Sequence, residues 1–426
     1  MANFLVTNLN DSGAGSLRAA ITAANLDQSG TPTTINFSVA GTINLASALP
    51  NISHEVVIDA TTAPGYVANS APVITLNCLG QAGLTFAFGA GGSELLGLAI
   101  GNASGHGVTL LGSNITIDKC YIGLAANGAD LGNGGDGIFI SAVSSYNHIG
   151  LNESHVSGVV GNVISGNNGN GVTIFGGTGN ILEANRIGTT PNGEAAMGNG
   201  LAGVHITNGA INNTIGGTVF VDAATGQVNN PTGSKGTEPG TFVVPPLGNL
   251  ISGNTGDGVL IDSQSQNNVL NGNFIGTVAN GDSALGNGRD GVHILGADNN
   301  SLIGCEFENN PFVYYNVVSG NAWNGLHITN SDNVTVQANF FGIGANNAAL
   351  VGNGYNGILV DGNSQNTTVG GVIPLGNVSA ANGQNGIYVT DTASDFITFN
   401  TFGGLFAFQG AAPNGENGIH IDATGG

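Results

Sequence analysis

The sequence contains very few basic residues. Only five of its 426 residues are Lys or Arg, against 26 Asp and Glu, which gives a formal net charge of −21. Phosphate backbones are bound by clustered basic side chains, so this shortage excludes nucleic acid as a partner. The same charge disfavours anionic membranes and, less decisively, polyanionic glycans. It suits solubility and an extracellular setting rich in salt or calcium.

Cysteine is also scarce, and long apolar runs are absent. Cys78, Cys120 and Cys305 are far apart, odd in number and without the spacing of metal ligands, so we interpret them as core thiols. No apolar stretch is long enough to cross a bilayer, which argues against membrane insertion. The chain enters a strand pattern at once, and we therefore expect no N-terminal signal peptide.

Glycine is abundant, and much of it belongs to a repeat. The chain has 74 glycines without a collagen period and only 7% charged residues, a composition typical of a turn-rich β protein. A marker, Gly-(Val/Ile/Leu)-x-(Ile/Val/Leu), returns mostly every 29 to 34 residues. It begins at Gly107, Gly137, Gly171, Gly203, Gly258, Gly291, Gly325, Gly357, Gly386 and Gly418. A fixed period of this length predicts a solenoid in which each unit is buried only against its neighbours.

Each repeat contains three short strands. In the marker, apolar Val172 and Ile174 alternate with a variable Thr173, which is the period of a β-strand. Two columns of Asn head the other two strands. The first column is Asn114, Asn147, Asn180, Asn213, Asn268, Asn300, Asn333 and Asn366, with Asp395 ninth, and the second is Cys120, Asn162, Asn185, Asn249, Asn273, Asn316, Asn339, Asn377 and Asn400. We expect the amides to bond along the stack as asparagine ladders.

These Gly-Val-x-Ile and Asn-x-Ile-x-Gly repeats resemble the right-handed parallel β-helix proteins of the pectin-lyase-like superfamily. The resemblance covers roughly residues 50–426. It implies an all-β fold, a right-handed parallel β-helix (β-solenoid) with three strands per coil. That superfamily includes lyases, hydrolases, epimerases, phage tailspikes and adhesins, so the fold alone does not choose an activity.

The first 50 residues differ from the repeats. Ser16 is a suitable N-cap for a short amphipathic helix whose apolar face is Leu17, Ala20, Ile21 and Ala24. The string DSGAGSLRAAITAAN resembles the N-terminal element of large secreted or surface bacterial β-helix proteins, which implies a cap. We therefore divide the chain into an N-terminal cap strand and helix (1–50) and a parallel β-helix (51–426). A loop insertion at 217–248 leaves the helix at one bend, the usual place for a functional loop.

The outward residues of the marker strands form the first candidate site. They are Thr109, Phe139, Thr173, His205, Leu260, His293, His327, Leu359, Tyr388 and His420. If the coils stack in register, His293 and His327 are neighbours about 4.8 Å apart. Flat polar and aromatic stripes bind sugar rings, so His205, His293, His327 and Tyr388 are candidate ligand-binding residues for a polysaccharide. The alternative is an ordinary exposed β-face.

Acidic residues in the long turns are the second candidate. Glycoside hydrolysis needs two carboxylates, and Asp282 and Asp290 flank one long turn. Because acidic residues recur with that turn, turn chemistry explains them at least as well. Oxygen ligands of this kind could also hold calcium, the one cofactor we consider, with Asp282 and Asp290 as weak metal candidates. No residue is assigned a catalytic role.

The regularity of the repeat decides the leading hypothesis. Active sites usually break the local rules of a fold, and we see no coil that breaks the consensus with a cluster of reactive groups. We therefore favour an extracellular or cell-surface scaffold or adhesion-type module, glycan-associated and non-catalytic. The alternative is a polysaccharide-active enzyme (lyase, hydrolase or epimerase) using the outer face of the marker-strand sheet. A further alternative is a self-assembling fibre unit joined end to end through an uncapped C-terminal coil.

Overall fold

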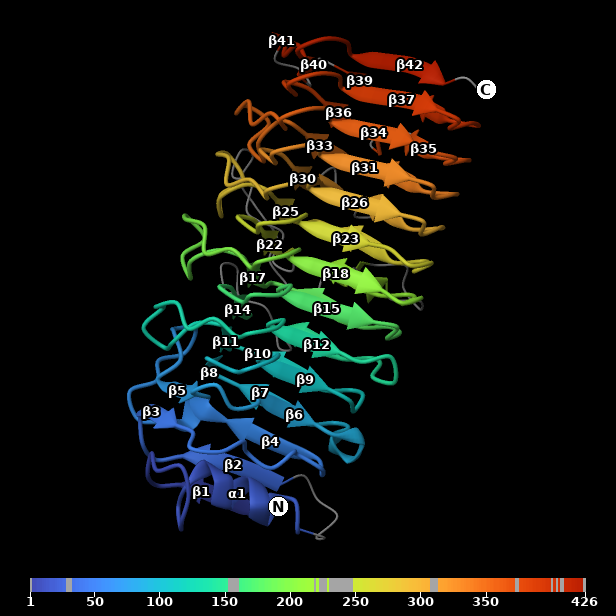
Figure 1. Cartoon of the computed structure of the whole chain (residues 1–426). Helices are drawn as coiled ribbons and strands as arrows, with labels where there is room; N and C mark the ends of the chain where they lie inside the picture. Colours follow the sequence, from blue (N-terminus) through green and yellow to red (C-terminus); the bar gives the residue numbers. More distant parts are fainter. Residues whose placement is uncertain are drawn as a thin grey trace.

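The protein is a right-handed parallel β-helix, as the sequence predicts (Figure 1). The computed structural model describes residues 2–27, 33–151, 161–217, 220–221, 228–229, 248–306, 313–371, 375–399, 401–403, 405–406 and 410–423. Its chain winds through three parallel sheets of 13, 12 and 11 strands, here sheets A, B and C. Three strands per coil, the second sequence-based expectation, are confirmed.

Sheets A and B form two walls of the stack. The strands of sheet A are β1 (Asn3–Val6), β2 (Thr33–Phe37), β4 (Val56–Asp59), β7 (Glu94–Leu96), β10 (Thr116–Asp118), β13 (His148–Gly150), β16 (Ile181–Glu183), β19 (Thr214–Gly216), β24 (Val269–Asn271), β27 (Ser301–Ile303), β32 (Thr335–Gln337), β35 (Thr368–Gly370) and β38 (Ile397–Phe399). Those of sheet B are β3 (Gly41–Asn44), β5 (Ile74–Asn77), β8 (Leu98–Gly101), β11 (Tyr121–Ile122), β14 (Val163–Ile164), β17 (Arg186–Ile187), β22 (Leu250–Ile251), β25 (Phe274–Ile275), β30 (Asn316–Val318), β33 (Asn339–Phe341), β36 (Val378–Ser379) and β39 (Phe402–Gly403).

Sheet C contains the marker strands. The sheet begins with β6 (Leu84–Phe86), which does not fit the marker. The marker strands are β9 (Val108–Leu110), β12 (Ile138–Ile140), β15 (Val172–Phe175), β18 (Val204–Thr207), β23 (Val259–Ile261), β26 (Val292–Leu295), β31 (Leu326–Thr329), β34 (Ile358–Asp361), β37 (Ile387–Asp391) and β42 (Ile419–Ala423). Alternate residues such as Val172 and Ile174 are fully buried in one continuous core. The marker glycine permits close approach of coils, because a Cβ at Gly171 would lie 2.6 Å from the carbonyl oxygen of Gly203. The alternation of inward and outward residues predicted for the marker strands is therefore present in sheet C.

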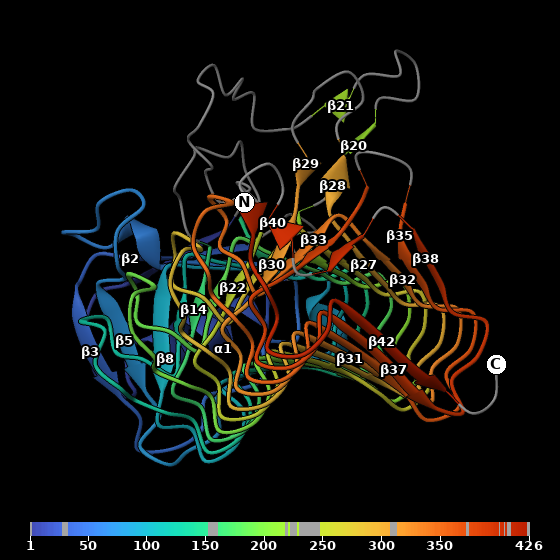
Figure 2. The ribbon, with the colours of Figure 1, turned by 90° about the horizontal axis from the view of Figure 1, so that it is seen from above.

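Short elements complete the described part of the chain. Two 3-10 turns are η1 (Ala60–Thr62) and η2 (Phe88–Ala90). Three antiparallel strand pairs project from the coils: β20 (Phe220–Val221) with β21 (Val228–Asn229), β28 (Cys305–Glu306) with β29 (Val313–Tyr314), and β40 (Leu405–Phe406) with β41 (Gly410–Ala411). Figure 2 shows β20, β21, β28 and β29 beyond the coils, on the side away from β31, β37 and β42 of sheet C.

The N-terminal helix has the predicted cap residue and buried face. Helix α1 (Leu17–Ala24) follows Ser16, whose Oγ accepts the backbone N–H of Ala19 at 3.2 Å. Its buried residues are Leu17, Ala20, Ile21 and Ala24, and they join the core of the coils. No helix in the described part of the chain is both long and apolar enough to span a bilayer. The division into 1–50 and 51–426 remains a prediction, and most of 217–248 lies outside the described residues.

Three asparagine ladders bind successive coils, and all three donate toward the following coil. Two contain predicted residues: Asn147, Asn180, Asn213, Asn268 and Asn300, and Asn162, Asn185, Asn249, Asn273, Asn316, Asn339 and Asn377. The third was not predicted and is the longest: Asn133, Asn167, Asn199, Asn254, Asn287, Asn321, Asn353, Asn382 and Asn414. Each buried amide finds its partner one coil away, which satisfies polar groups inside the stack.

Four residues of the first predicted column do not belong to its ladder. Asn114, Asn333, Asn366 and Asp395 are exposed and have positive φ between 51° and 58°. In the ladder coils, that left-handed position is the residue before the ladder Asn, for example Gly179 before Asn180. Asn suits both positions, since it tolerates left-handed backbone as well as ladder bonding. The column drawn from sequence therefore mixed two adjacent positions.

The described cysteine side chains are buried, as expected. Burial raises the pKa of Cys78 and that of Cys120 to about 12, so both thiols stay protonated. Cys120 heads its strand at a ladder position, and its backbone N–H donates to Asn162 Oδ1 at 2.9 Å. The side chain of Cys305 lies outside the described residues.

The long turns cover the outside of sheet B. Each doubles back on itself, as in the pairing of Thr277 with Ala284 and of Ile343 with Leu350. Beneath them lies a second apolar cluster: Leu250, Phe274, Val317, Phe340, Ile343, Ala345, Val378, Ala380 and Ala412. On sheet C, by contrast, the outward histidines stay about a fifth exposed, with side-chain values of 22% for His205, 19% for His293 and 18% for His327. Sheet C thus presents functional groups to solvent.

Candidate functional site

The outward residues of sheet C form one continuous column. Strand register pairs Thr173 with His205, then Leu260, His293, His327, Leu359, Tyr388 and His420 in successive coils. The rings of His293 and His327 stack, with centroids 4.5 Å apart and planes 4° from parallel. Tyr388 stacks instead on His420 at 4.8 Å, and Leu260 separates His205 from His293. Of the four predicted ligand-binding residues, the structure therefore brings together two.

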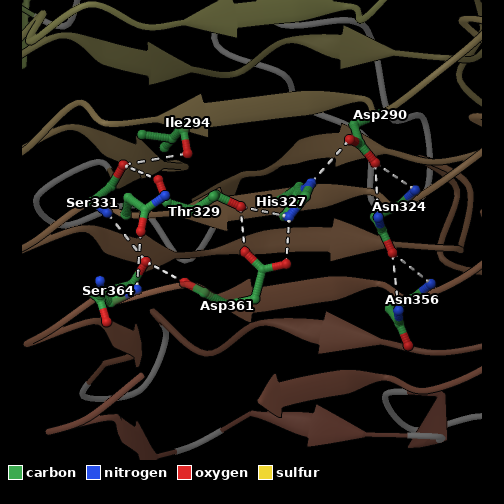
Figure 3. A network of polar contacts seen from close by, with 11 residues as sticks. Asp290, Ile294, Asn324, His327, Thr329, Ser331, Asn356, Asp361 and Ser364 are labelled. Carbon is green, nitrogen blue, oxygen red and sulfur yellow. Dashed lines mark hydrogen bonds and ion pairs between the residues drawn. The ribbon is translucent and has the colours of Figure 1, made fainter. Parts of the chain in front are cut away.

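His327 lies between two carboxylates (Figure 3). Its Nδ1 is 3.3 Å from Asp290 Oδ2, and its Nε2 is 3.0 Å from Asp361 Oδ2. Thr329 Oγ1 lies 2.7 Å from His327 Nε2 and also donates to Asp361 Oδ1. Asp361 and Thr329 come from the second outward position of adjacent marker strands, β34 and β31. The ring is therefore fixed through both nitrogens.

His293 has a looser environment. Its Nδ1 lies 4.0 Å from Asp257 Oδ2, beyond hydrogen-bond distance. Its Nε2 is buried and has no hydrogen-bond partner among the described residues. A buried ring nitrogen without a partner is unusual and calls for an explanation. His293 thus keeps a nitrogen available for a proton.

Asp257 and Asp290 break the repeat. Both immediately precede a marker glycine, as does a third aspartate, Asp136. Five other coils have Asn at this position: Asn170, Asn324, Asn356, Asn385 and Asn417. Asp257 and Asp290 are 4% and 1% exposed and lie on adjacent coils, where the backbone N–H of Asp290 donates to Asp257 Oδ1 at 3.0 Å. Two buried like charges so close are costly unless one is protonated or paired. This is the kind of local violation that the sequence analysis judged absent.

Four side chains of the cluster have pKa values shifted in different directions: His293, His327, Asp257 and Asp361. Burial lowers the pKa of His293, and the charge of His327 lowers it further. Burial acts in the same sense on His327, but hydrogen bonds to Asp290 and Asp361 outweigh it and raise its pKa to about 9. Burial and the charge of Asp290 raise the pKa of Asp257 to about 6. Burial opposes the ionisation of Asp361, yet its bonds from His327 and Thr329 hold its pKa below the ordinary value.

A metal ion does not fit this cluster well. Asp290, His293 and His327 each offer one ligand atom, all within 4.8 Å of one another. However, an ion bound to imidazole nitrogen lies near the ring plane, and two parallel stacked rings have no common point in plane. The other predicted metal candidate, Asp282, accepts the backbone N–H of Asn346 at 2.9 Å in the turn layer. No described contact joins Asp282 to Asp290.

Arg289 stands at the rim of the cluster, where its charge acts to lower the pKa of Asp257 and that of His293. Its guanidinium lies 5.5 Å from the ring centroid of Trp323, and both side chains are exposed. Arg18, Lys119 and Arg186 bind Asp11, Asp118 and the Pro191 carbonyl oxygen, respectively. Lys235 lies outside the described residues. Within the described part of the chain, Arg289 is the basic side chain that makes no hydrogen bond or ion pair.

A second His–Asp pair lies further along the same column. His205 Nε2 is 3.1 Å from Asp262 Oδ2, and Asp262 also bonds to Thr207. Burial raises the pKa of Asp262, but hydrogen bonds from His205 and Thr207 outweigh it and lower that pKa. The unit lies three coils before His327, counted through Leu260 and His293.

The structural features missed in the sequence had a visible signal. Asp257, Thr329 and Asp361 were not singled out, and Asp290 was considered only as a turn residue with Asp282. The signal is the replacement of Asn by Asp before two consecutive marker glycines, Gly258 and Gly291. It becomes significant only once the position is known to be buried beside the outward histidines.

Solved structures of low sequence identity are similar to this chain. No family model and no curated protein matches the sequence. Among solved structures, the Azotobacter vinelandii mannuronan C-5 epimerase AlgE4 A-module is 11% identical, with 98% of each chain covered and a TM-score of 0.41. A variant of the periplasmic alginate epimerase AlgG is 12% identical over 87% of this chain and 76% of that chain, with a TM-score of 0.39. Tailspike protein 2 of the Escherichia coli O157:H7 bacteriophage CAB120 is 11% identical, with a TM-score of 0.34, over 95% of this chain and 38% of that one.

The hypothesis of a non-catalytic scaffold or adhesion module is wrong. Its premise was that no coil breaks the consensus with reactive groups, whereas Asp257 and Asp290 do so beside the stacked histidines. The similar structures are titled as alginate or mannuronan epimerases and as a tailspike. Similarity at this level concerns the fold alone. The function is therefore inferred from the residues around His293 and His327.

Proposed function

We propose that the protein is a polysaccharide-active enzyme that performs acid–base catalysis with His293 and His327 on the outer face of sheet C. One observation supports this above all: two stacked histidines have pKa values shifted in opposite directions. Neighbouring titratable groups shifted apart are the pattern of an acid paired with a base. Alginate and mannuronan epimerases with a similar fold agree with a glycan substrate.

His293 is the base in this proposal, and His327 is the acid. The lowered pKa of His293 leaves its imidazole uncharged at neutral pH, so the partly exposed ring can accept a proton. His327 is an imidazolium held by Asp290 and Asp361, so it can stabilise negative charge that develops on the substrate. General acid–base catalysis of this kind contributes typically about 10²–10⁴-fold to a rate.

Arg289 favours an acidic sugar as the substrate unit. Its free guanidinium suits a carboxylate, which it can bind through two parallel hydrogen bonds. The net charge of −21 weighs against a polyanion, but exposed charges beyond roughly 10 Å are largely screened at ordinary salt. A cation in direct contact with the substrate therefore affects its binding more than distant acidic residues do. We place the substrate carboxylate at the guanidinium of Arg289.

The chemistry that follows is proton abstraction next to a carboxylate. The C–H bond beside the substrate carboxylate breaks, its proton passes to the His293 imidazole, and its electron pair moves onto the carboxylate as an enolate. Arg289 and His327 stabilise this charge. The intermediate then regains a proton, which gives epimerisation, or expels the glycosidic oxygen on the adjacent carbon, which gives elimination with protonation of the leaving group.

Hydrolysis by two carboxylates is less well supported. Asp257 and Asp290 are 4% and 1% exposed and lie below the histidines, so they do not reach a sugar on the surface. The groups that face solvent are His293 and His327, at 19% and 18% side-chain exposure. The exposed chemistry is therefore that of imidazoles rather than of a carboxylate pair.

The test is an assay in D2O with acidic and neutral polysaccharides. We expect deuterium to enter acidic sugars, detected by NMR, with or without absorbance from an unsaturated product. His420→Ala, on the same column but stacked on Tyr388, is the matched control and should keep the activity. Reducing ends released from a neutral glycan, without deuterium exchange, would contradict the mechanism. Binding of a glycan without turnover would contradict the assignment as an enzyme.

An extracellular or cell-surface location is proposed with this function, because polymeric glycans are encountered outside the cytoplasm. One similar structure is titled periplasmic and another a phage tailspike. Fractionation of the producing cells, followed by detection of the protein, tests the location. Recovery in the cytoplasm alone would contradict it. Calcium dependence and end-to-end association stay predictions.

A further inference from the structure

A fourth asparagine ladder runs in the opposite direction to the other three. The side-chain Nδ2 of Asn417 donates to Asn385, Asn385 to Asn356, Asn356 to Asn324, and Asn324 to Asp290, at 2.9, 3.1, 3.0 and 2.9 Å. Each donation is toward the preceding coil. Figure 3 shows its end, with Asn356, Asn324 and Asp290 in line beside His327. The ladder therefore ends at the candidate site.

Backbone hydrogen bonds fix this direction. The N–H of Asn324 donates to Asp290 Oδ1 at 2.8 Å, and the N–H of Asn356 donates to Asn324 Oδ1 at 3.1 Å. The same holds at Asn385 and Asn417, at 3.1 and 3.2 Å. A backbone N–H can only donate, so the atom that it meets must be the amide oxygen. The orientation of every amide in the ladder is determined by its neighbour.

The ladder treats the two buried aspartates differently. Asp290 Oδ1 accepts two N–H groups from Asn324, whereas Asp257 Oδ1 accepts one, from the backbone of Asp290. Donors stabilise an ionised carboxylate, and aligned amides polarise one another along the chain. Asp290 Oδ1 therefore receives more donors than Asp257 Oδ1, and the second oxygen of Asp290 is directed at His327.

We propose that Asn324 is a positioning residue that, supported by Asn356, Asn385 and Asn417, holds Asp290 as a hydrogen-bond-accepting carboxylate against His327. This inference rests on the proposed function, in which His327 is the acid. It extends the machinery of that reaction to residues that touch no substrate. The ladder acts through Asp290 alone, because the other groups around His327 make no hydrogen bond to a ladder amide: Asp361, Thr329, His293 and Asp257.

The test is an NMR titration of the His327 ring, which needs no substrate. The Asn324→Leu variant removes the side-chain donor, and we expect the pKa of His327 to fall by about one unit, a tenfold change. Asn321→Leu is the matched control, because Asn321 is equally buried in the same coil but belongs to a ladder without a carboxylate. It should leave the titration unchanged. His327→Gln assigns the resonance.

Equal titrations of His327 in Asn324→Leu and in the control would overturn the proposal. If Asn324→Leu does not fold, Asn356→Leu replaces it, since it leaves Asn324 and Asp290 bonded and removes only the next amide. A smaller fall in the same direction supports the ladder, and no change refutes it. Because the measurement reads protonation, it holds even if no glycan is turned over, so this proposal and the proposed function fail independently.

Discussion

The units around His205 and His327 are two copies of one arrangement. Their strands read Val-His-Ile-Thr and Leu-His-Ile-Thr, and the next coil supplies Asp262 or Asp361 from the same outward position. The distance from His Nε2 to Asp Oδ2 is 3.1 Å in the first unit and 3.0 Å in the second. Both units follow from the repeat, so the pair alone does not define a site.

The two units differ on the side of the histidine ring that faces the preceding coil. Asp290 faces Nδ1 of His327, whereas the corresponding position before His205 holds Asn170. The Asn170 amide donates to Thr173 Oγ1 at 3.0 Å and accepts the N–H of Ala202 at 2.9 Å. One change from Asn to Asp thus distinguishes the two units. A repeat protein can specialise one coil while its neighbours keep the contacts of the repeat.

The largest expected effect is on catalysis. His327→Gln and His293→Gln should each lower kcat by about 10²–10⁴-fold, because each removes a general acid or base. His205→Gln, in the matched unit, should lower it by less than about tenfold. Initial rates on the active glycan measure all three. Equal losses at His205 and His327 would show that the duplicated unit, rather than Asp290, determines activity.

The next effect is on stability at alkaline pH. The pKa of His327 in the folded protein is about 9 against an ordinary 6.5, a difference equivalent to about 3 kcal/mol. Because the folded value is raised, this stabilisation is complete below pH 6.5 and is lost as the pH rises through about 9. Denaturant unfolding of the wild type should therefore lose about 3 kcal/mol more than His327→Gln across that window. Parallel curves would contradict the ion pairs with Asp290 and Asp361.

The smallest effect is an exchange of character between the two units. Asp290→Asn removes the carboxylate at Nδ1, so the pKa of His327 should fall by about one to two units. Asn170→Asp introduces one and should raise the pKa of His205 by a similar amount. Two-dimensional NMR of the ring nitrogens follows both. A value for His205 that stays fixed in Asn170→Asp would mean that another group, not the carboxylate, separates the units.

Much of the fold could be predicted from the sequence, because its rules repeat. Marker strands, two ladders and the helix after Ser16 each depend on local patterns of residue type. The ladder through Asn133 and Asn167 was missed although its residues stand four positions before each marker glycine, because Asn is frequent throughout these glycine-rich turns. Asn114 and Asn333 were misplaced because Asn serves two adjacent positions.

The site was only half predicted, for a physical reason. Outward alternation places His293 and His327 side by side, which needs only the strand period. Asp257 and Asp290 lie in turns, where the sequence does not show which way a side chain points or how deeply it is buried. Their chemistry depends on that burial. Asp282, chosen with Asp290 for its place in the same turn, belongs to a different layer.

The stacking of coils also has a mechanical consequence. Hydrogen bonds between successive coils run along the stack, and each coil contacts only its neighbours, so a pull on the two ends acts on one interface at a time. A released coil of 29 to 34 residues can extend by on the order of 100 Å at about 3.4 Å per residue. We expect force spectroscopy to record a series of similar steps rather than a single rupture. Under tension the protein would lengthen in steps, one coil at a time.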